Sequence, residues 1–147
     1  MPDRVSSIPE QFGLAIGDCA RIWRNRVNER LKPLGLSQAA WLALWHLSFF
    51  PGGIGQTDLA ERLGIEGPTL VRLLDRLAAD SLIRREIAPH DKRCKQVVLT
   101  DDAKPVLAQV RAIIADLRGE IMAGIPDTQL LDGLRLLALI RTRLAVA

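Results

Sequence analysis

The 147-residue sequence predicts a mainly α-helical fold with one β-hairpin in its middle third. Apolar residues recur at steps of three and four along both ends of the chain, which is the period of amphipathic helices. Between them, two short β-leaning runs flank a polar turn. The length fits one compact domain, and the 48% hydrophobic and 25% charged residues are ordinary for a chain that folds.

The first predicted helix carries an apolar stripe from Phe12 onward and should end before Pro33, because proline cannot continue a helix. The stripe includes Cys19, so we expect this thiol to be buried as a small apolar group. A second helix is predicted after Ser37, a favourable N-cap, and should end by Pro51. Because it is apolar on most sides, we expect it to be central.

Two shorter helices are predicted next. The first spans Gln56–Leu63, and Gly64 stands where a left-handed C-cap residue is expected. Pro68 suits the first position of the second helix. The core stripe predicted for that helix is Leu70, Val71, Leu74 and Leu77. Two helices joined by a short glycine-containing turn form a helix-turn-helix, and an ordinary helical hairpin is the alternative.

The hairpin is predicted from Leu82–Ile87 and Lys95–Thr100, with a polar tip over Ala88–Arg93. A β-hairpin directly after a helix-turn-helix is a wing. The predicted fold is therefore mainly α: a winged helix-turn-helix with long N- and C-terminal helices and a two-stranded β-wing. Thr100 is predicted as the N-cap of the next helix, and a last helix follows Pro126.

The terminal helices carry more apolar surface than one small winged domain can cover, which is typical of a partner surface. We therefore expect a homodimer. Residues 1–35 are predicted to form an N-terminal dimerisation helix, 36–100 the winged helix-turn-helix DNA-binding region, and 101–147 the C-terminal dimerisation helices, in one compact domain per protomer.

The formal net charge of +3 is concentrated in one segment. Arg62–Gln96 holds eight Lys and Arg residues against five Asp and Glu residues, and the rest of the chain balances. A localised basic patch of this kind favours a polyanionic partner, and double-stranded DNA is the partner that a winged helix-turn-helix suggests.

The second helix of the pair places Thr69, Arg72 and Arg76 opposite its leucine stripe. Arginine can bond bidentately to guanine, and threonine can meet a base edge or a thymine methyl group. A solvated face in which the arginines pair with acids such as Asp75 is the alternative. The hairpin adds five cations that can reach phosphates or a narrow minor groove: Arg84, Arg85, Lys92, Arg93 and Lys95.

Asp91 lies two residues before Arg93 at the hairpin tip. A carboxylate in this place can hold the guanidinium group in one rotamer, and ordinary turn chemistry of aspartate is the alternative. The run from Asp91 to Thr100 resembles the wing signature of the MarR family of bacterial transcription regulators, an Asp-x-Arg followed by a strand that ends in Leu-Thr.

Other segments extend this resemblance over nearly the whole chain. LAERLGIEGPTLVRLLDRLAADSLI is similar to the helix-turn-helix of that family, and RIWRNRVNERLKPLGLSQ and RGEIMAGI resemble its SlyA branch. The resemblance implies a homodimer on a pseudo-palindromic operator, often released by small aromatic acids. It also implies that Pro68, Thr69 and Arg72 contact the major groove and that Arg93, ordered by Asp91, enters the minor groove. The sequence departs from the family where Thr69 replaces a frequent serine.

A ligand site is expected beside the first helix. Arg21 and Arg24 lie on its polar side, and the chain contains Trp41 and Trp45 in the next helix. A cation beside apolar rings can hold an aromatic carboxylate by charge pairing and stacking. The resemblance implies that Arg24 meets such a carboxylate, with Trp41 nearby. The alternative is that the tryptophans belong to the core and that Arg24 is a surface charge.

The sequence gives no sign of catalysis. A nucleophile elbow and a P-loop are absent, and the two cysteines and two histidines match no metal-ligand spacing, so we expect no enzyme, no cofactor and no metal. No apolar run reaches the roughly 18 residues of a membrane span. The segment Met1–Glu10 lacks the features of a signal peptide. A cytoplasmic protein without membrane contact is expected.

These observations predict a DNA-binding transcription regulator. A repressor is the default, because a dimer without an activation domain can act by occupying a promoter. Two alternatives stay open. One is a redox-sensing regulator of the same fold, through Cys19 or through Cys94 in the basic wing, although Cys19 lies on an apolar stripe and the chain has no tyrosine. The other is a winged helix that binds another protein.

Overall fold

The computed structural model describes residues 7–147, except for the side chain of Cys94. Two predictions fall partly or wholly outside these residues: the absence of a signal peptide in Met1–Glu10 and the oxidation of the Cys94 thiol. The chain divides into two compact units, Met1–Ile114 and Ala115–Ala147. The fold is mainly helical with a small antiparallel sheet, which confirms the predicted fold class.

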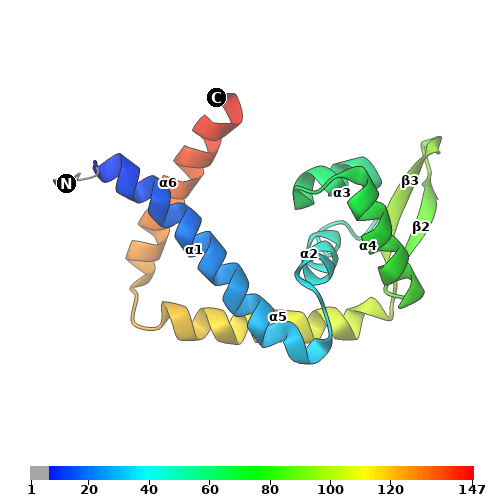
Figure 1. Ribbon diagram of the computed structural model, residues 1–147, viewed down its shortest axis with the longest axis horizontal. Helices are drawn as coiled ribbons and strands as arrows, with labels where there is room; N and C mark the ends of the chain where they lie inside the picture. The colour runs from blue at the N-terminus through cyan, green and yellow to red at the C-terminus, as the bar shows by residue number, and fades with distance from the viewer. Residues whose placement is uncertain (1–6) are drawn as a thin grey trace, which may run out of the picture. The chain divides into compact units, whose positions relative to one another are not determined.

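The elements follow the predicted order (Figure 1). In chain order they are α1 (Ile8–Leu31), the short 3₁₀ helix η1 (Lys32–Leu34), α2 (Gln38–Leu47), β1 (Ile54–Gly55), α3 (Gln56–Leu63), α4 (Gly67–Ala79), β2 (Ile83–Ala88), β3 (Asp91–Leu99), α5 (Ala103–Met122) and α6 (Asp127–Val146).

The first two helices begin at side-chain caps. The Glu10 amide donates to Ser7 Oγ at 3.3 Å at the start of α1, and the Ala40 amide donates to Ser37 Oγ at 3.2 Å at the start of α2. Each cap satisfies a backbone N–H that has no partner inside the helix. The prediction of Ser37 as an N-cap is confirmed. Half of the ten α2 residues are buried, Trp41 and Leu44 among them, so this helix is central, as predicted.

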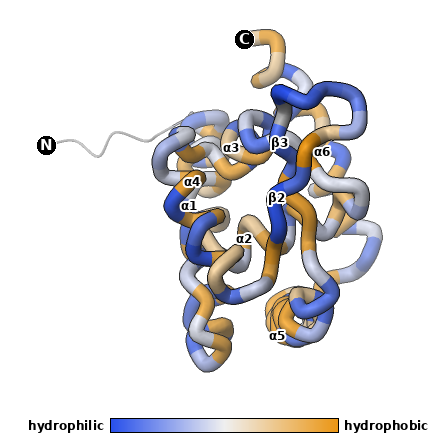
Figure 2. The backbone as a smooth tube through the Cα atoms, turned by 90° about the vertical axis from the view of Figure 1, so that its right-hand side faces the viewer, coloured by the Kyte–Doolittle hydropathy of each residue, from blue (hydrophilic) through white to orange (hydrophobic). Residues whose placement is uncertain are grey.

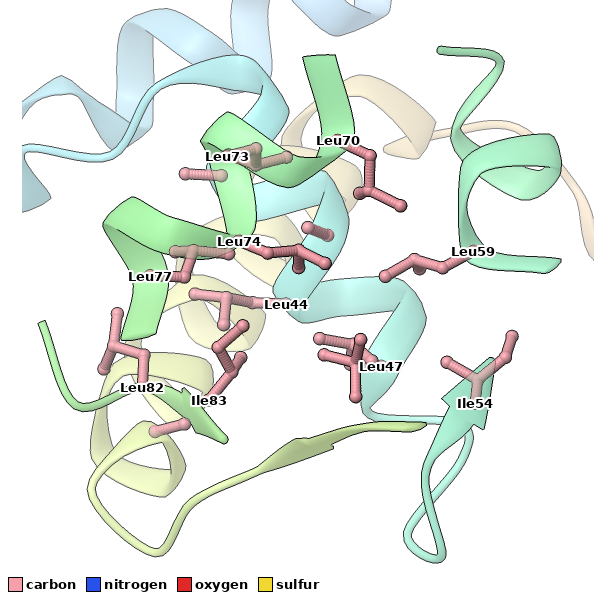
Figure 3. Packing of buried hydrophobic residues seen from close by; sticks show 14 of the residues in the cluster. Leu44, Leu47, Ile54, Leu59, Leu70, Leu73, Leu74, Leu77, Leu82 and Ile83 are labelled. Carbon is pink, nitrogen blue, oxygen red and sulfur yellow. The ribbon is translucent and has the colours of Figure 1, made fainter. Parts of the chain in front are cut away.

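The core of the first unit lies between α2 and α4. Leu70, Leu74 and Leu77 of α4 point toward Leu44 and Leu47 of α2 (Figure 3). The predicted α4 stripe is wrong at one position. Val71 is 41% exposed, and Leu73 is buried at 8% instead. Both positions fit a three-and-four spacing around Leu70 and Leu74, so the period alone does not separate them.

The sheet has three strands in the order β1-β3-β2, and both pairings are antiparallel. The prediction of a two-stranded wing missed β1, in which Ile54 pairs with Val97 of β3. Two residues are too few to show an alternating pattern. The turn before β1 needs a glycine, because Gly53 has a φ of 94° and a Cβ there would lie 2.9 Å from Val98 Cγ2.

The tip of the β2–β3 hairpin is irregular. Ile87 pairs with Lys95, but the next pair joins Ala88 to Asp91, so the register shifts by three residues. Residues 92–94 of β3 therefore lie between two successive pairs without a partner position on β2. The hairpin is longer than the sequence predicts, because the paired strands continue into the polar segment assigned to the tip.

Thr100 is not the N-cap of the helix that follows the wing. Helix α5 begins at Ala103, and the Thr100 hydroxyl donates to the carbonyl oxygen of Ser81 at 2.5 Å. The bond spans 19 residues and joins the two ends of the hairpin, so local sequence could not predict it. The expected burial of Cys19 on α1 is also wrong for the single chain, in which this residue is exposed.

In the second unit, α6 leaves most of its apolar side chains uncovered. The most exposed large ones are Leu134 at 63%, Leu144 at 71% and Val146 at 85%. Exposed apolar side chains in such number on one helix are unusual for an isolated soluble chain. Within the part of the chain that the structure describes, every helix falls short of the length and apolarity that a membrane span requires.

Candidate nucleic-acid interface

Helices α3 and α4 form the helix-turn-helix, and α4 lies between α3 and the β2–β3 hairpin (Figure 1). Gly64 ends α3 with φ 64° and ψ 34°, the left-handed conformation that the sequence predicts. Its amide and that of Ile65 donate to the carbonyl oxygens of Glu61 and Ala60, both at 3.1 Å. This C-cap turns the chain sharply, so that α4 begins only three residues later.

The outer face of α4 is polar and accessible. Pro68, Thr69, Arg72 and Arg76 are all exposed, and the leucines on the opposite face are buried. None of the ion pairs found among residues 7–147 includes Arg72 or Arg76. The alternative in which these arginines pair with Asp75 is thus not what the structure shows. The helix presents one hydroxyl and two guanidinium groups to solvent.

Asp75 pairs with the wing instead. Arg85 Nη2 of β2 lies 2.8 Å from Asp75 Oδ1 and donates to the carbonyl oxygen of Val71 at 3.3 Å. The Arg85 side chain is only 26% exposed. Arg85 is thus the predicted DNA contact on β2 whose guanidinium group is bonded to α4. It fixes the base of the wing to the middle of α4.

Arg84 lies on the same strand, in a strongly hydrophilic stretch of β2 (Figure 2). Its Nε donates to Glu86 Oε1 at 2.5 Å. Arg84 also lines a cavity of about 470 Å³ together with Lys104 and Arg111 of α5. Asp101 in this cavity lies 2.8 Å from Lys104, and that hydrogen bond and charge lower the pKa of Asp101 and raise the pKa of Lys104.

The wing tip carries the remaining predicted contacts. Lys92, Arg93 and Lys95 are exposed, and Asp91 Oδ1 accepts a hydrogen bond from the Arg93 amide at 2.9 Å. This bond orders the backbone at Arg93, which is the turn chemistry that the sequence offered as the alternative. Because Arg93 lies in the segment without a strand partner, its side chain projects from an irregular, locally fixed tip.

Arg24 of α1 lines a second cavity, of about 250 Å³, together with residues from the first turns of α2 and from the end of α3. The walls are mainly apolar, and Gln38 is the other polar residue among the described lining residues, while Arg24 Nε donates to the Ala20 carbonyl oxygen at 3.4 Å. The walls consist of Gln38, Ala39, Leu42, Leu63 and Ile65. The sequence predicts Arg24 as a ligand residue but does not indicate these other lining residues. Leu42 stands one turn after Gln38 on α2, but nothing local indicates that Leu63 and Ile65 lie opposite them.

The other predicted ligand residues lie elsewhere. Trp41 is buried, and its indole Nε1 donates to Asn28 Oδ1 of α1 at 2.7 Å. Trp45 packs edge-to-face on Phe49, with ring centroids 6.1 Å apart. Arg21 pairs with Asp18 at 2.9 Å on the exposed side of α1. The structure therefore brings Arg24 to a cavity but does not bring Arg21, Trp41 and Trp45 into it.

The chain is similar in sequence and structure to known transcription regulators. The sequence profile of the MarR family matches residues 34–93. The solved structure of the transcriptional regulator PA3341 is 38% identical, with a TM-score of 0.86 over 92% of this chain and 99% of that chain. CouR from Rhodococcus jostii RHA1, solved with p-coumaroyl-CoA, is 24% identical with a TM-score of 0.79, over 92% of this chain and 94% of its own.

A third structure is a mutant of S. aureus MepR bound to an oligodeoxyribonucleotide. It is 19% identical, with a TM-score of 0.61, over 90% of this chain and 97% of that chain. Because CouR and MepR are less than 25% identical to this chain, they show a shared fold only. Membership of the family is shown by the sequence profile and by the 38% identity to PA3341. The chain belongs to the MarR family of DNA-binding winged helix-turn-helix transcription regulators.

Proposed function

We propose that this regulator is a repressor of the SlyA-like branch that binds a pseudo-palindromic operator as a homodimer. The observation that carries the proposal is the outer face of α4, where Thr69, Arg72 and Arg76 are exposed beside a wing that ends in Arg93. A hydroxyl and two guanidinium groups suit base edges in the major groove, and a basic tip suits the minor groove.

Three parts of the chain have separate roles in this proposal. Residues 36–100 contact DNA, through Pro68, Thr69, Arg72 and Arg76 on α4 and through the basic wing residues. Residues 1–35 and 101–147 form the dimer. The exposed apolar side chains of α1 and α6 support this arrangement, since a second copy would remove them from water.

The first test is selection of duplexes from a genomic pool. The affinity for the most enriched duplex is then compared with the affinity for a scrambled duplex at two salt concentrations. We expect an inverted repeat, bound about 10³-fold more tightly than the scrambled duplex. Weak, steeply salt-dependent binding without sequence preference would overturn the proposal, because the basic patch would then only attract phosphates.

Two substitutions, Arg93→Ala and Arg72→Ala, distinguish the proposed wing contact in the minor groove from the proposed base contact in the major groove. Loss of Arg93 should weaken binding to all sequences and lower the salt slope by about one. Loss of Arg72 should cost roughly 1–3 kcal/mol and relax preference at one base pair. Arg118→Ala, an exposed change on α5 outside the proposed contacts, serves as the control. Unchanged operator affinity in Arg93→Ala would remove the wing from the mechanism.

We further propose that a small aromatic carboxylate releases the repressor by binding in the Arg24 cavity. Its volume of about 250 Å³ suits a single-ring ligand, with the guanidinium group for the carboxylate and apolar walls for the ring. Because Trp41 and Trp45 do not line the cavity, the ring would pack on aliphatic side chains such as Leu42 and Ile65.

Calorimetry with a panel of hydroxybenzoates tests this site. Arg24→Ala should weaken binding at least tenfold, the effect expected when a charge-assisted hydrogen bond is lost. Arg21→Ala is the matched control, because Arg21 pairs with Asp18 on the same helix and does not line the cavity. Equal affinity in wild type and Arg24→Ala, or no binding at all, would refute an effector at this site.

Cysteine oxidation is a second candidate for the release step, favoured by one observation. Cys19 is exposed on α1 in the single chain, so an oxidant can reach its thiol there. Operator affinity is to be compared before and after mild peroxide in wild type, Cys19→Ser and Cys94→Ser. An equal response in all three proteins would rule out either cysteine as the trigger.

A further inference from the structure

Val71 is an apolar side chain on the exposed, N-terminal half of the recognition helix α4. It is the fifth residue of that helix and is 41% exposed. Its neighbours Pro68, Thr69 and Arg72 are exposed as well. Residues near the start of a recognition helix are the ones that contact base edges in helix-turn-helix proteins. Val71 also lines the groove between α3 and α4, so its side chain lies on the accessible surface near the start of the recognition helix.

The backbone at Val71 is fixed to the wing. Arg85 Nη2 donates to the Val71 carbonyl oxygen at 3.3 Å and pairs at 2.8 Å with Asp75, one helical turn further on. A β-branched side chain in a helix has one strongly preferred χ1 rotamer. The two methyl groups of Val71 thus occupy nearly fixed positions, and they lose little conformational entropy when a partner packs against them.

Among the groups that base edges present in the major groove, the C5-methyl group of thymine is the apolar one. Valine offers no hydrogen-bond donor or acceptor from its side chain, so it can favour a base edge only through such a contact. We propose that Val71 sets a preference for thymine at one operator position, and that Arg85 acts as a positioning residue for it. This inference rests on the proposed operator binding.

The test uses the selected operator with each thymine replaced in turn by deoxyuridine, which lacks only the methyl group. Wild type should lose about fourfold in affinity at one position per half-site, the factor for one buried methyl group. Val71→Ala should show no loss at that position and should bind the thymine and uracil duplexes alike. Alanine is the better helix former and Val71 is exposed, so the variant should fold.

Gly52→Ala is the control, because Gly52 lies outside α4 and outside the proposed dimer helices, and no atom lies within 4 Å of an added Cβ there. It should keep the wild-type response to uracil at every position. Arg85→Gln tests the positioning role. The ratio of thymine to uracil affinity should fall toward one, whereas a merely structural role would lower both affinities by the same factor.

The outcomes are distinct. Sequence-blind binding by wild type removes the proposed function and this inference together. If the protein binds the operator but no thymine-to-deoxyuridine change lowers its affinity, the inference alone is wrong. The inference is also wrong if Val71→Ala loses as much affinity as wild type on that change.

Discussion

Arg85 of β2 and Asp75 of α4 form an ion pair, with Nη2 and Oδ1 2.8 Å apart, that joins the wing to the recognition helix. Arg85 is the half-buried partner, at 26% exposed against 61% for Asp75. The two elements that are expected to enter adjacent grooves of DNA are thus held together by one side-chain pair and one hydrogen bond to the Val71 carbonyl oxygen.

Asp75→Ala should lower the free energy of unfolding by about 1 kcal/mol, because the pair is partly exposed and Arg85 is left half-buried without its charge partner. Operator affinity should fall as well, since the wing is then less firmly fixed. Urea denaturation and DNA titration measure the two effects. Asp132→Ala, which removes an exposed pair with Arg135 on α6, should leave stability within experimental error.

Gly53→Ala should destabilise the protein by roughly 1–3 kcal/mol. The residue has a φ of 94°, and an added Cβ would lie 2.9 Å from Val98 Cγ2 and 3.2 Å from the Val97 carbonyl oxygen. The neighbouring Gly52 has no atom within 4 Å of an added Cβ, so Gly52→Ala is the control. Equal melting temperatures for the two variants would contradict the strain argument.

His46 should make the protein less stable in mild acid. Burial, and then the positive charge of Arg62, lower the pKa of His46 from its usual 6.5. The unfolded chain therefore binds this proton more readily than the folded one, so stability is full above about pH 6.5 and falls as the pH drops through the lowered value.

Unfolding free energies at pH 7.5, 6.5 and 5.5 test this in His46→Gln, which should lose less stability than wild type over that range. His90→Gln, an exposed change at the wing turn, should follow the wild-type curve. If the unfolding free energy of His46→Gln fell with pH as steeply as that of wild type, the acid sensitivity would come from other groups.

Leu134→Glu combined with Leu137→Glu should convert the proposed dimer to monomers. Both side chains lie on α6 and are 63% and 48% exposed in the single chain, so charge is tolerated unless a partner covers them. Light scattering gives the mass, and operator affinity should fall because a monomer holds only one half-site. Gln129→Glu on the same helix should remain a dimer. If the double variant keeps its mass, the dimer does not form through this face.

Local chemistry made much of this fold predictable. The N-cap at Ser37, the left-handed conformation of Gly64 and the leucine spacing of α4 each depend on residues only a few positions apart. The structure confirms all three, except that Val71 of the predicted α4 stripe is exposed. The failures are long-range. Strand β1 exists because Ile54 meets Val97, and the Thr100 hydroxyl is used by Ser81 rather than by the next helix.

The candidate sites divide in the same way. The exposed face of α4 follows from one helix period, so Thr69, Arg72 and Arg76 could be chosen from sequence. The role of Arg85 could not, because its partner Asp75 belongs to another element. The Arg24 cavity depends on how three helices converge, and no sequence pattern places Leu63 opposite Gln38.

The strand order β1-β3-β2 leaves β2 as an edge strand. An open edge invites pairing with the edge of another chain, which leads to aggregation. In β2 the consecutive residues Arg84, Arg85 and Glu86 are charged, and charge on an edge strand discourages such pairing. The charges of β2 thus also protect the protein from self-association through its sheet, and neutral β-branched replacements there would lower its solubility.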